Sequence, residues 1–207
     1  MEEIKVILFI IIIFLSCTSP KTNIYESYSR VSYIKENIDL SISHFKELVK
    51  NFPQNAEYQR ILGICYRENK QYDSALIAMN HSILLAPKYG NAYLGRAMVY
   101  LNLNDWESAR EDCHLAQKYQ CNALGQLYST LGIIALHRQN YRESIEFVQK
   151  SNHYSDAIYC KQNDWILAQN YLSLKDTIKA IKYLKKHTSI NPKDSAATNL
   201  LTQLLND

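Results

Sequence analysis

Five cysteines and six histidines are the residues of this 207-residue chain that could supply a nucleophile or metal ligands. No two cysteines form a Cys-x-x-Cys pair and no histidine lies at zinc-finger spacing, which disfavours a metal site. Cys113 and His114 are adjacent, but neighbouring residues on a helix point about 100° apart and cannot share a proton. Glu107 and Glu111 are four residues apart, as on a solvated helix face. We therefore expect no catalytic residues, no metal and no cofactor, and we do not expect an enzyme.

Cys17 stands apart because of the segment that precedes it. An unbroken apolar run extends from Val6 to Leu15, too short for a bilayer-spanning anchor of about 20 residues but typical of a signal-peptide core. The small residue Ser16 follows the run. This segment resembles a bacterial lipoprotein signal, which implies cleavage before Cys17 and diacylglycerol on the Cys17 sulfur. The resemblance thus predicts a signal peptide at 1–16, lipid attachment at Cys17 and a polar tether at 17–23.

Two acidic residues, Glu2 and Glu3, depart from the positive end that signal peptides usually carry. An ordinary cleaved signal and an uncleaved anchor therefore remain alternatives. Lipoproteins retained in the inner membrane of enteric bacteria carry Asp after the lipidated cysteine, where this chain has Thr18. The resemblance accordingly predicts a lipoprotein of the bacterial cell envelope, anchored in the outer membrane.

The amino-acid composition limits the fold classes and the kinds of partner to be expected. With 47% hydrophobic and 21% charged residues, the chain can bury a sizeable core. A net charge of +3, taken as evenly spread, is too small for the basic stripe that nucleic-acid binding requires. Only 5 Gly and 4 Pro disfavour an all-β fold or a glycine-rich phosphate loop.

The chain is periodic, with small residues recurring at steps of 34, 35 and 36 residues. A second series of small residues lies 12 positions after the first. Between them, apolar residues recur every three or four positions, as on one face of a helix. Two helices can approach to about 8 to 10 Å only where their crossing carries a small side chain. The two series are Gly63, Ala97, Gly132 and Ala168, then Ala75, Ala109, Ser144 and Ala180.

This pattern resembles the tetratricopeptide repeat family, whose unit is a 34-residue helix-turn-helix. The segment from Leu62 to Tyr66 matches the Leu-Gly-x-x-Tyr part of the family pattern. The resemblance implies an all-α, right-handed α-α superhelix (solenoid) of about five repeats with a C-terminal capping helix. The expected units are a degenerate first repeat at 22–55, repeats at 56–89, 90–124, 125–160 and 161–194, and the cap at 195–207.

In this family the first helix of each unit lines a concave groove that holds an extended peptide or a partner helix. The resemblance therefore implies a largely apolar protein-binding groove. Some members capture a chaperone's C-terminal carboxylate with a basic clamp, of which only Arg60 has a counterpart here. The expected lining is Arg60, Ile61, Ile64 and Arg67; Asn91, Leu94, Met98 and Leu101; Gln126, Ser129, Ile133 and Leu136; and Trp165, Ile166, Gln169 and Leu172.

These observations predict a lipid-anchored repeat protein that acts as a scaffold or assembly factor for another protein. The predicted partners are a protein in the groove and the membrane that holds the lipid anchor, and no nucleic acid. Two alternatives remain: a lipoprotein that binds a nutrient or glycan for uptake, and a non-catalytic regulatory subunit of an envelope complex.

Overall fold

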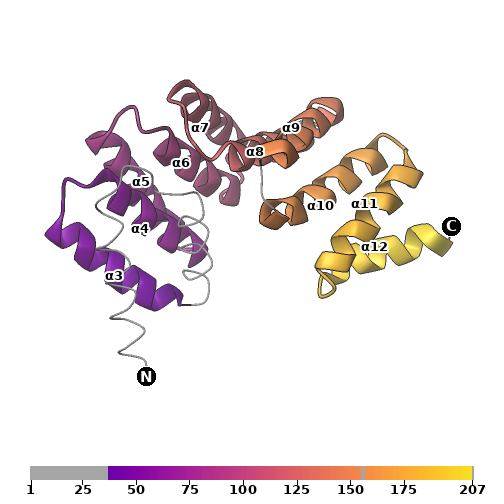
Figure 1. Ribbon diagram of the computed structural model, residues 1–207, viewed down its shortest axis with the longest axis horizontal. Helices are drawn as coiled ribbons and strands as arrows, with labels where there is room; N and C mark the ends of the chain where they lie inside the picture. Colours follow the sequence, from indigo (N-terminus) through magenta and orange to yellow (C-terminus); the bar gives the residue numbers. More distant parts are fainter. Residues whose placement is uncertain (1–36, 155–156, 207) are drawn as a thin grey trace.

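The computed structural model describes residues 37–154 and 157–206. Within them the chain forms ten α-helices and no strand, so the predicted all-α fold is confirmed. Figure 1 shows the helices following one another along an arch from α3 to α12. They are α3 (Ile38–Asn51), α4 (Ala56–Glu68), α5 (Tyr72–Leu85), α6 (Gly90–Asn102), α7 (Trp106–Lys118), α8 (Leu124–His137), α9 (Tyr141–Tyr154), α10 (Ala157–Ser173), α11 (Thr177–Ile190) and α12 (Ser195–Asn206).

The expected signal peptide at 1–16, Cys17, the tether at 17–23 and the first helix of the 22–55 repeat lie outside the described residues. Helix α3 falls in the second half of that repeat. Within the ranges that the structure describes, every helix is too short or too polar to cross a membrane.

The small residues of the two series lie where paired helices meet. All eight are buried, from Gly63 to Ala180. At Gly63, a Cβ atom would come within 2.9 Å of Met79 Cε on α5. In the pair of α8 and α9, the Ser144 hydroxyl donates to the Gly132 carbonyl over 2.7 Å. Close contact between the helices of each pair is therefore what these positions provide, as the periodicity predicted.

The helices form four successive pairs: α4 with α5, α6 with α7, α8 with α9, and α10 with α11. The turn between the two helices has the same construction in each pair. One residue adopts a left-handed conformation, with φ near 60° at Lys70, Asn104, Gln139 and Lys175. The amide of the following residue then donates back to the preceding helix, as Gln71 does to the Tyr66 carbonyl over 2.9 Å. This arrangement satisfies carbonyl groups that a helix end leaves without partners. Side chains of Asp105 and Asp176 cap the helices that follow two of these turns.

The core is a series of apolar clusters between successive helices, as expected for a solenoid. Residues such as Phe45 and Leu62 form the cluster of α3 to α5, and Leu94 and Leu127 contribute to that of α6 to α8. At the C-terminal end, Leu200, Leu201 and Leu204 of α12 pack against a cluster that contains Leu184. Helix α12 thus covers the last helix pair.

Helix α10 packs against α8 and α9 partly through polar side chains. Asn163 and Asn170, seven residues apart on α10, are fully buried. The Ser129 hydroxyl donates to Asn163 Oδ1 over 2.8 Å, and Asn170 Nδ2 donates to Ser144 Oγ over 2.8 Å. Helix α10 begins at Ala157, ahead of the expected unit boundary at 161, and its 17 residues exceed the 13 or 14 of the first helices before it. Amides and hydroxyls, which require fixed geometry, therefore add to the apolar contacts of Val148, Ile166 and Leu167 that attach α10.

Candidate functional site

The first helices of three successive pairs, α4, α6 and α8, form the wall of a cavity of about 1960 Å³. The connections that precede α4, α6 and α8 also contribute to its lining. Figure 1 shows these three helices lying one after another along the arch. A cavity of this size is large for a small-molecule pocket, which usually holds about 300 to 1,000 Å³.

Most of the expected groove residues on these three helices line the cavity. Leu94 and Ile61 are buried at 2% and 3% exposure, so they belong to the core as well as to the wall. Met98 and Gln126 are half-buried and therefore present part of their side chains to the cavity. The expected residues that line it are Arg60, Ile61, Ile64, Arg67, Asn91, Leu94, Met98, Leu101, Gln126, Ser129 and Ile133.

The remaining expected residues do not line this cavity. Leu136 and Ile166 pack into the apolar cluster that contains Val148. The Trp165 ring lies 5.7 Å from the His187 ring, on the side of α10 that faces α11 and α12. Gln169 and Leu172 are half-buried on the same helix. A groove role for these residues stays a prediction, because on α10 the cavity reaches Gln162, which was not among the expected residues.

Aromatic residues outside the first helices also line the cavity, although they were not among the expected groove residues. Tyr72 and Trp106 begin the second helices α5 and α7, while Phe52 and Tyr89 lie in connections. Tyr154 ends α9 and is 52% exposed. Tyr72 and Trp106 occupy the same position of the repeat, 34 residues apart. The 34-residue period could therefore have predicted that both line the cavity.

Charge is distributed unevenly along the cavity. The lining residues of α6 and α8 are all uncharged, and the charged ones belong to α4 and to the connections after α4 and α5. Amide side chains such as Asn91 and Gln126 alternate there with apolar ones. Amides donate and accept hydrogen bonds and can pair with an extended main chain, while apolar walls hold its side chains.

Arg60, at the α4 end of the cavity, is held by two neighbours. Its Nη2 and Nε donate to the two Glu57 carboxylate oxygens over 2.7 and 2.8 Å, and its Nε also lies 3.1 Å from the Tyr89 hydroxyl. The Tyr89 hydroxyl in turn donates to Glu57. Burial disfavours the charged guanidinium, but the hydrogen bonds and charge of Glu57 outweigh it and raise the pKa of Arg60. Burial raises the pKa of Tyr89 to about 12.

This network changes what Arg60 can do. Its charge is already balanced by a bidentate carboxylate, so it is poorly suited to capture the carboxylate of a ligand. The other positions of the chaperone-tail clamp carry Ile64, Gly95, Gln126 and Thr130, all uncharged. On α6 and α8 the cavity therefore offers apolar surface and amide or hydroxyl hydrogen-bonding groups.

Among the described residues, no three His, Cys, Asp or Glu side chains are grouped closely enough to hold a metal ion. Cys113 is fully buried, whereas its neighbour His114 is exposed. Cys65, Cys113 and Cys121 are buried and form no disulfide among the described residues. Burial raises the pKa of Cys65 to about 12, and that of Cys121 to about 11, so these thiols are weak nucleophiles.

A tetratricopeptide repeat family model matches residues 35–83, and a second tetratricopeptide repeat model matches residues 165–194. These two segments resemble tetratricopeptide repeats. The matches fall at the two ends of the arch, and the helix pairs between them repeat the same turn and the same buried small residues. No curated protein matches the chain.

Solved tetratricopeptide repeat proteins share this fold. A thermophilic protein of Thermus thermophilus, TTC0263, is 17% identical with a TM-score of 0.68, over 84% of this chain and 94% of that one. PilF of Pseudomonas aeruginosa is 16% identical with a TM-score of 0.63, over 73% and 68%. YrrB, described as having an unusual peptide-binding site, is 13% identical with a TM-score of 0.59, over 77% and 81%. At these identities the similarity shows the fold alone.

Proposed function

We propose that this chain is a lipid-anchored tetratricopeptide repeat scaffold of the bacterial cell envelope, held in the outer membrane through Cys17. Its partner is another protein, which places an extended segment or a helix in the cavity of α4, α6 and α8. It is not an enzyme. The lipid anchor and the location rest on the sequence pattern at residues 1–18 alone.

The observation that carries the binding role is the cavity itself. The cavity has a volume of about 1960 Å³, and its wall combines apolar side chains with amides. Such a wall suits a polypeptide, whose side chains need apolar contact and whose main chain needs hydrogen-bond partners. A helix has a diameter of about 10 Å with its side chains, so one helix can lie in a space of this volume. The peptide-binding site described for YrrB supports the same use of the fold.

The proposed mechanism is placement. Anchoring fixes the cavity at the membrane surface and raises its effective concentration for any partner there without adding contacts. Met98 and Ile64 on the wall take apolar side chains of the partner, and Gln126 bonds its main chain. Because Glu57 already balances Arg60, the partner needs no terminal carboxylate at that end.

A charge placed on the cavity wall tests this proposal. Met98 is the position of choice because it is half-buried and lines the cavity, whereas the 2% exposed Leu94 packs in the core, and a charge there would unfold the chain. Met98→Glu should abolish co-purification of the partner from detergent-solubilised membranes, since an unpaired charge is costly in an apolar interface. The control is Ile77→Glu, at a residue of α5 that is 59% exposed.

Both variants should keep the wild-type helical content by circular dichroism. If Ile77→Glu removes the partner and Met98→Glu retains it, the binding surface lies outside the cavity and the proposal is wrong. Lipid attachment is measured separately, so a failure of one part of the proposal does not conceal the other.

A further inference from the structure

The net charge of the chain is concentrated at one end of the arch. Residues 157–207 contain seven lysines and four aspartates, whereas residues 1–156 contain sixteen basic and sixteen acidic residues. The whole formal charge of +3 therefore belongs to the C-terminal quarter. The expectation that charge is spread evenly along the chain is wrong for this part.

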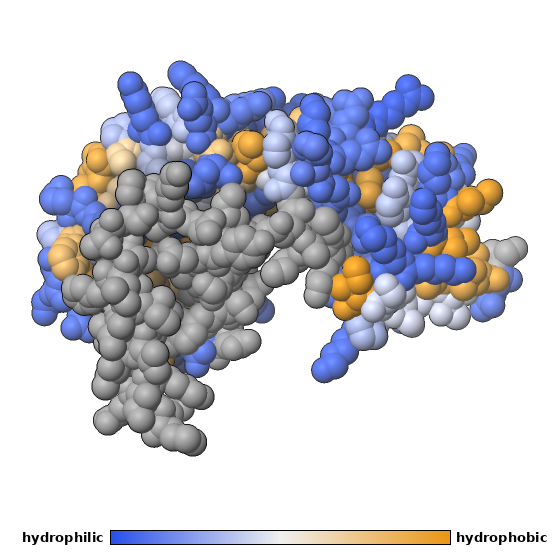
Figure 2. Space-filling model, viewed as in Figure 1, coloured by the Kyte–Doolittle hydropathy of each residue, from blue (hydrophilic) through white to orange (hydrophobic). Residues whose placement is uncertain are grey.

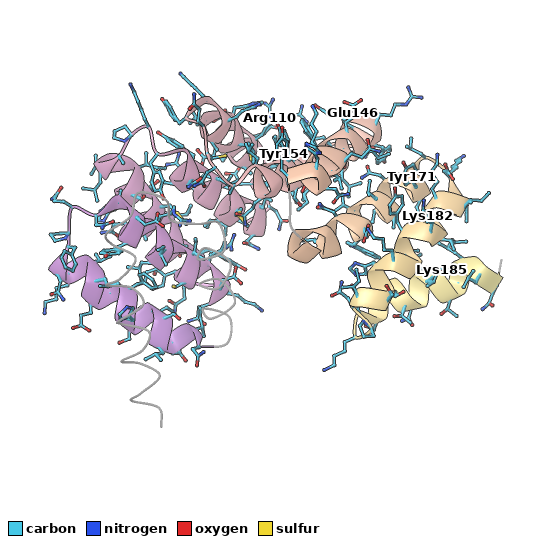
Figure 3. All side chains as sticks on the ribbon, viewed as in Figure 1. Arg110, Glu146, Tyr154, Tyr171, Lys182 and Lys185 are labelled. Carbon is cyan, nitrogen blue, oxygen red and sulfur yellow. The ribbon has the colours of Figure 1, made fainter. Side chains whose placement is uncertain are left out.

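Helix α11 carries most of this charge on its outer face. Between Asp176 and Asp194 the sequence contains five lysines and no acid. Asp176 pairs with Lys179 over 2.8 Å, and Asp164 of α10 pairs with Lys186 over 2.9 Å. No ion pair among the described residues engages Lys182 or Lys185, both of which are exposed. Figure 3 shows Lys182 near Tyr171 of α10, with Lys185 farther from that tyrosine.

An apolar side chain stands in the middle of the basic face. Ile178 is 84% exposed, the highest value among the large hydrophobic residues that the structure describes. Lys182 and Lys185 follow it by four and seven residues, which places all three on one stripe of the helix. Leu174, in the turn just before α11, is 41% exposed. In Figure 2 the surface over α10 to α12 shows apolar patches among hydrophilic side chains.

The corresponding helices of the other pairs differ. Helix α7 carries acids and bases together, and its Arg110 pairs with Glu107 over 2.8 Å. Helix α9 likewise contains two glutamates beside its arginine and lysine, and α5 contains a single charged residue, Asp73. A face of one sign with a protruding apolar residue is therefore a property of α11, and the repeat pattern does not require it.

We infer that the outer face of α11 is a docking surface for an anionic phospholipid bilayer. Lysines on such a face are attracted to anionic headgroups, and an exposed aliphatic side chain can enter the boundary between headgroups and acyl chains. Lys182 and Lys185 contact the headgroups, and Ile178 inserts beside them. The cavity lies on the first helices, so this contact leaves it accessible. The inference goes beyond the proposed groove function and does not depend on it.

Lysine footprinting of the full-length protein tests the inference. An amine-reactive acetylating reagent is applied with vesicles of phosphatidylglycerol and phosphatidylcholine, or of phosphatidylcholine alone, and modified lysines are quantified by mass spectrometry. Lys182 and Lys185 should be labelled several-fold less with the anionic vesicles. Lys118 of α7, which is also exposed to the reagent, should be labelled the same with both.

Two variants sharpen the test. Ile178→Asp should abolish the protection of Lys182 and Lys185, and because the side chain is exposed the fold is not at risk. The matched control is Leu84→Asp on α5, a residue that is 75% exposed, which should leave the protection intact. Replacing Lys182 and Lys185 by Gln should reduce the ratio of binding to anionic over neutral vesicles about 25-fold, at about fivefold per lysine.

Three results would overturn the inference. One is equal labelling of Lys182 and Lys185 with anionic and neutral vesicles. Another is protection that survives Ile178→Asp. The third is protection by polyglutamate or by a DNA duplex but not by anionic vesicles, which would assign the surface to an acidic macromolecule.

Discussion

Gly90 is the position where a single methyl group should be least tolerated. It is the first residue of α6 and is buried against the end of α7. A Cβ atom at Gly90 would lie 2.7 Å from the Cys121 nitrogen and 2.8 Å from the carbonyl oxygens of Ala116 and Tyr119. All three obstacles are backbone atoms. Gly90→Ala can therefore be accommodated only by moving the end of α7 away from α6.

The size of the effect follows from two opposing contributions. Alanine favours a helix over glycine by about 1 kcal/mol at an interior position, and by less at the first residue. Overpacking costs about 1 to 3 kcal/mol when neighbours must shift. The net loss in the free energy of unfolding should therefore be about 1 to 2 kcal/mol. In a chain of this size that lowers Tm by roughly 2 to 8 °C.

Gly63→Ala is the matched control. There the obstacle is the flexible end of the Met79 side chain, whose Cε lies 2.9 Å from the Cβ position. Met79 can change rotamer, so the helix-propensity gain should offset much of the cost. Thermal unfolding followed by circular dichroism measures both variants. A Gly90→Ala protein as stable as Gly63→Ala, or more stable, would refute the close approach of α6 to the end of α7.

Three further predictions concern the thiols, the cap and the anchor. In the folded protein at about pH 8, iodoacetamide should leave three buried thiols unmodified by mass spectrometry, because burial raises the pKa of each; labelling before unfolding would contradict the packing of Cys65, Cys113 and Cys121. Deleting 195–207 should cause aggregation in size-exclusion chromatography, because α12 covers an apolar cluster; a soluble monomer would show that it is not a cap. Labelled palmitate should enter the wild-type protein and not Cys17→Ala; equal labelling would remove the lipoprotein proposal.

The repeat architecture could be predicted because it depends on residue size at fixed spacing. Each helix crossing needs a small side chain, so small residues recur at the positions that correspond to Gly63 and Ala75. All of these small residues are buried, as the periodicity predicted. Helical periodicity and the small-residue series together determine which helices pair. The cavity wall from Arg60 to Ile133 follows from the same register.

Other features depended on contacts that the period does not encode. The left-handed residues in the turns, such as Lys70 and Gln139, are not glycines, so their types gave no signal. The pairing of Arg60 with Tyr89 joins residues 29 positions apart. On α10 the cavity reaches Gln162, and the buried amides of Asn163 and Asn170 accompany the apolar packing of that helix. Local patterns predict which face a residue occupies, but hydrogen bonds between distant side chains need the assembled structure.

Site-specific photo-crosslinking in cells tests the central claim most directly, because it reports what contacts the cavity without disturbing the fold. A photoreactive amino acid at position 98, on the cavity wall, is compared with the same amino acid at position 77, on the exposed face of α5. We predict that position 98 crosslinks to one defined protein and that position 77 does not. Crosslinks to that protein from position 77 but not from position 98 would contradict recognition through the cavity.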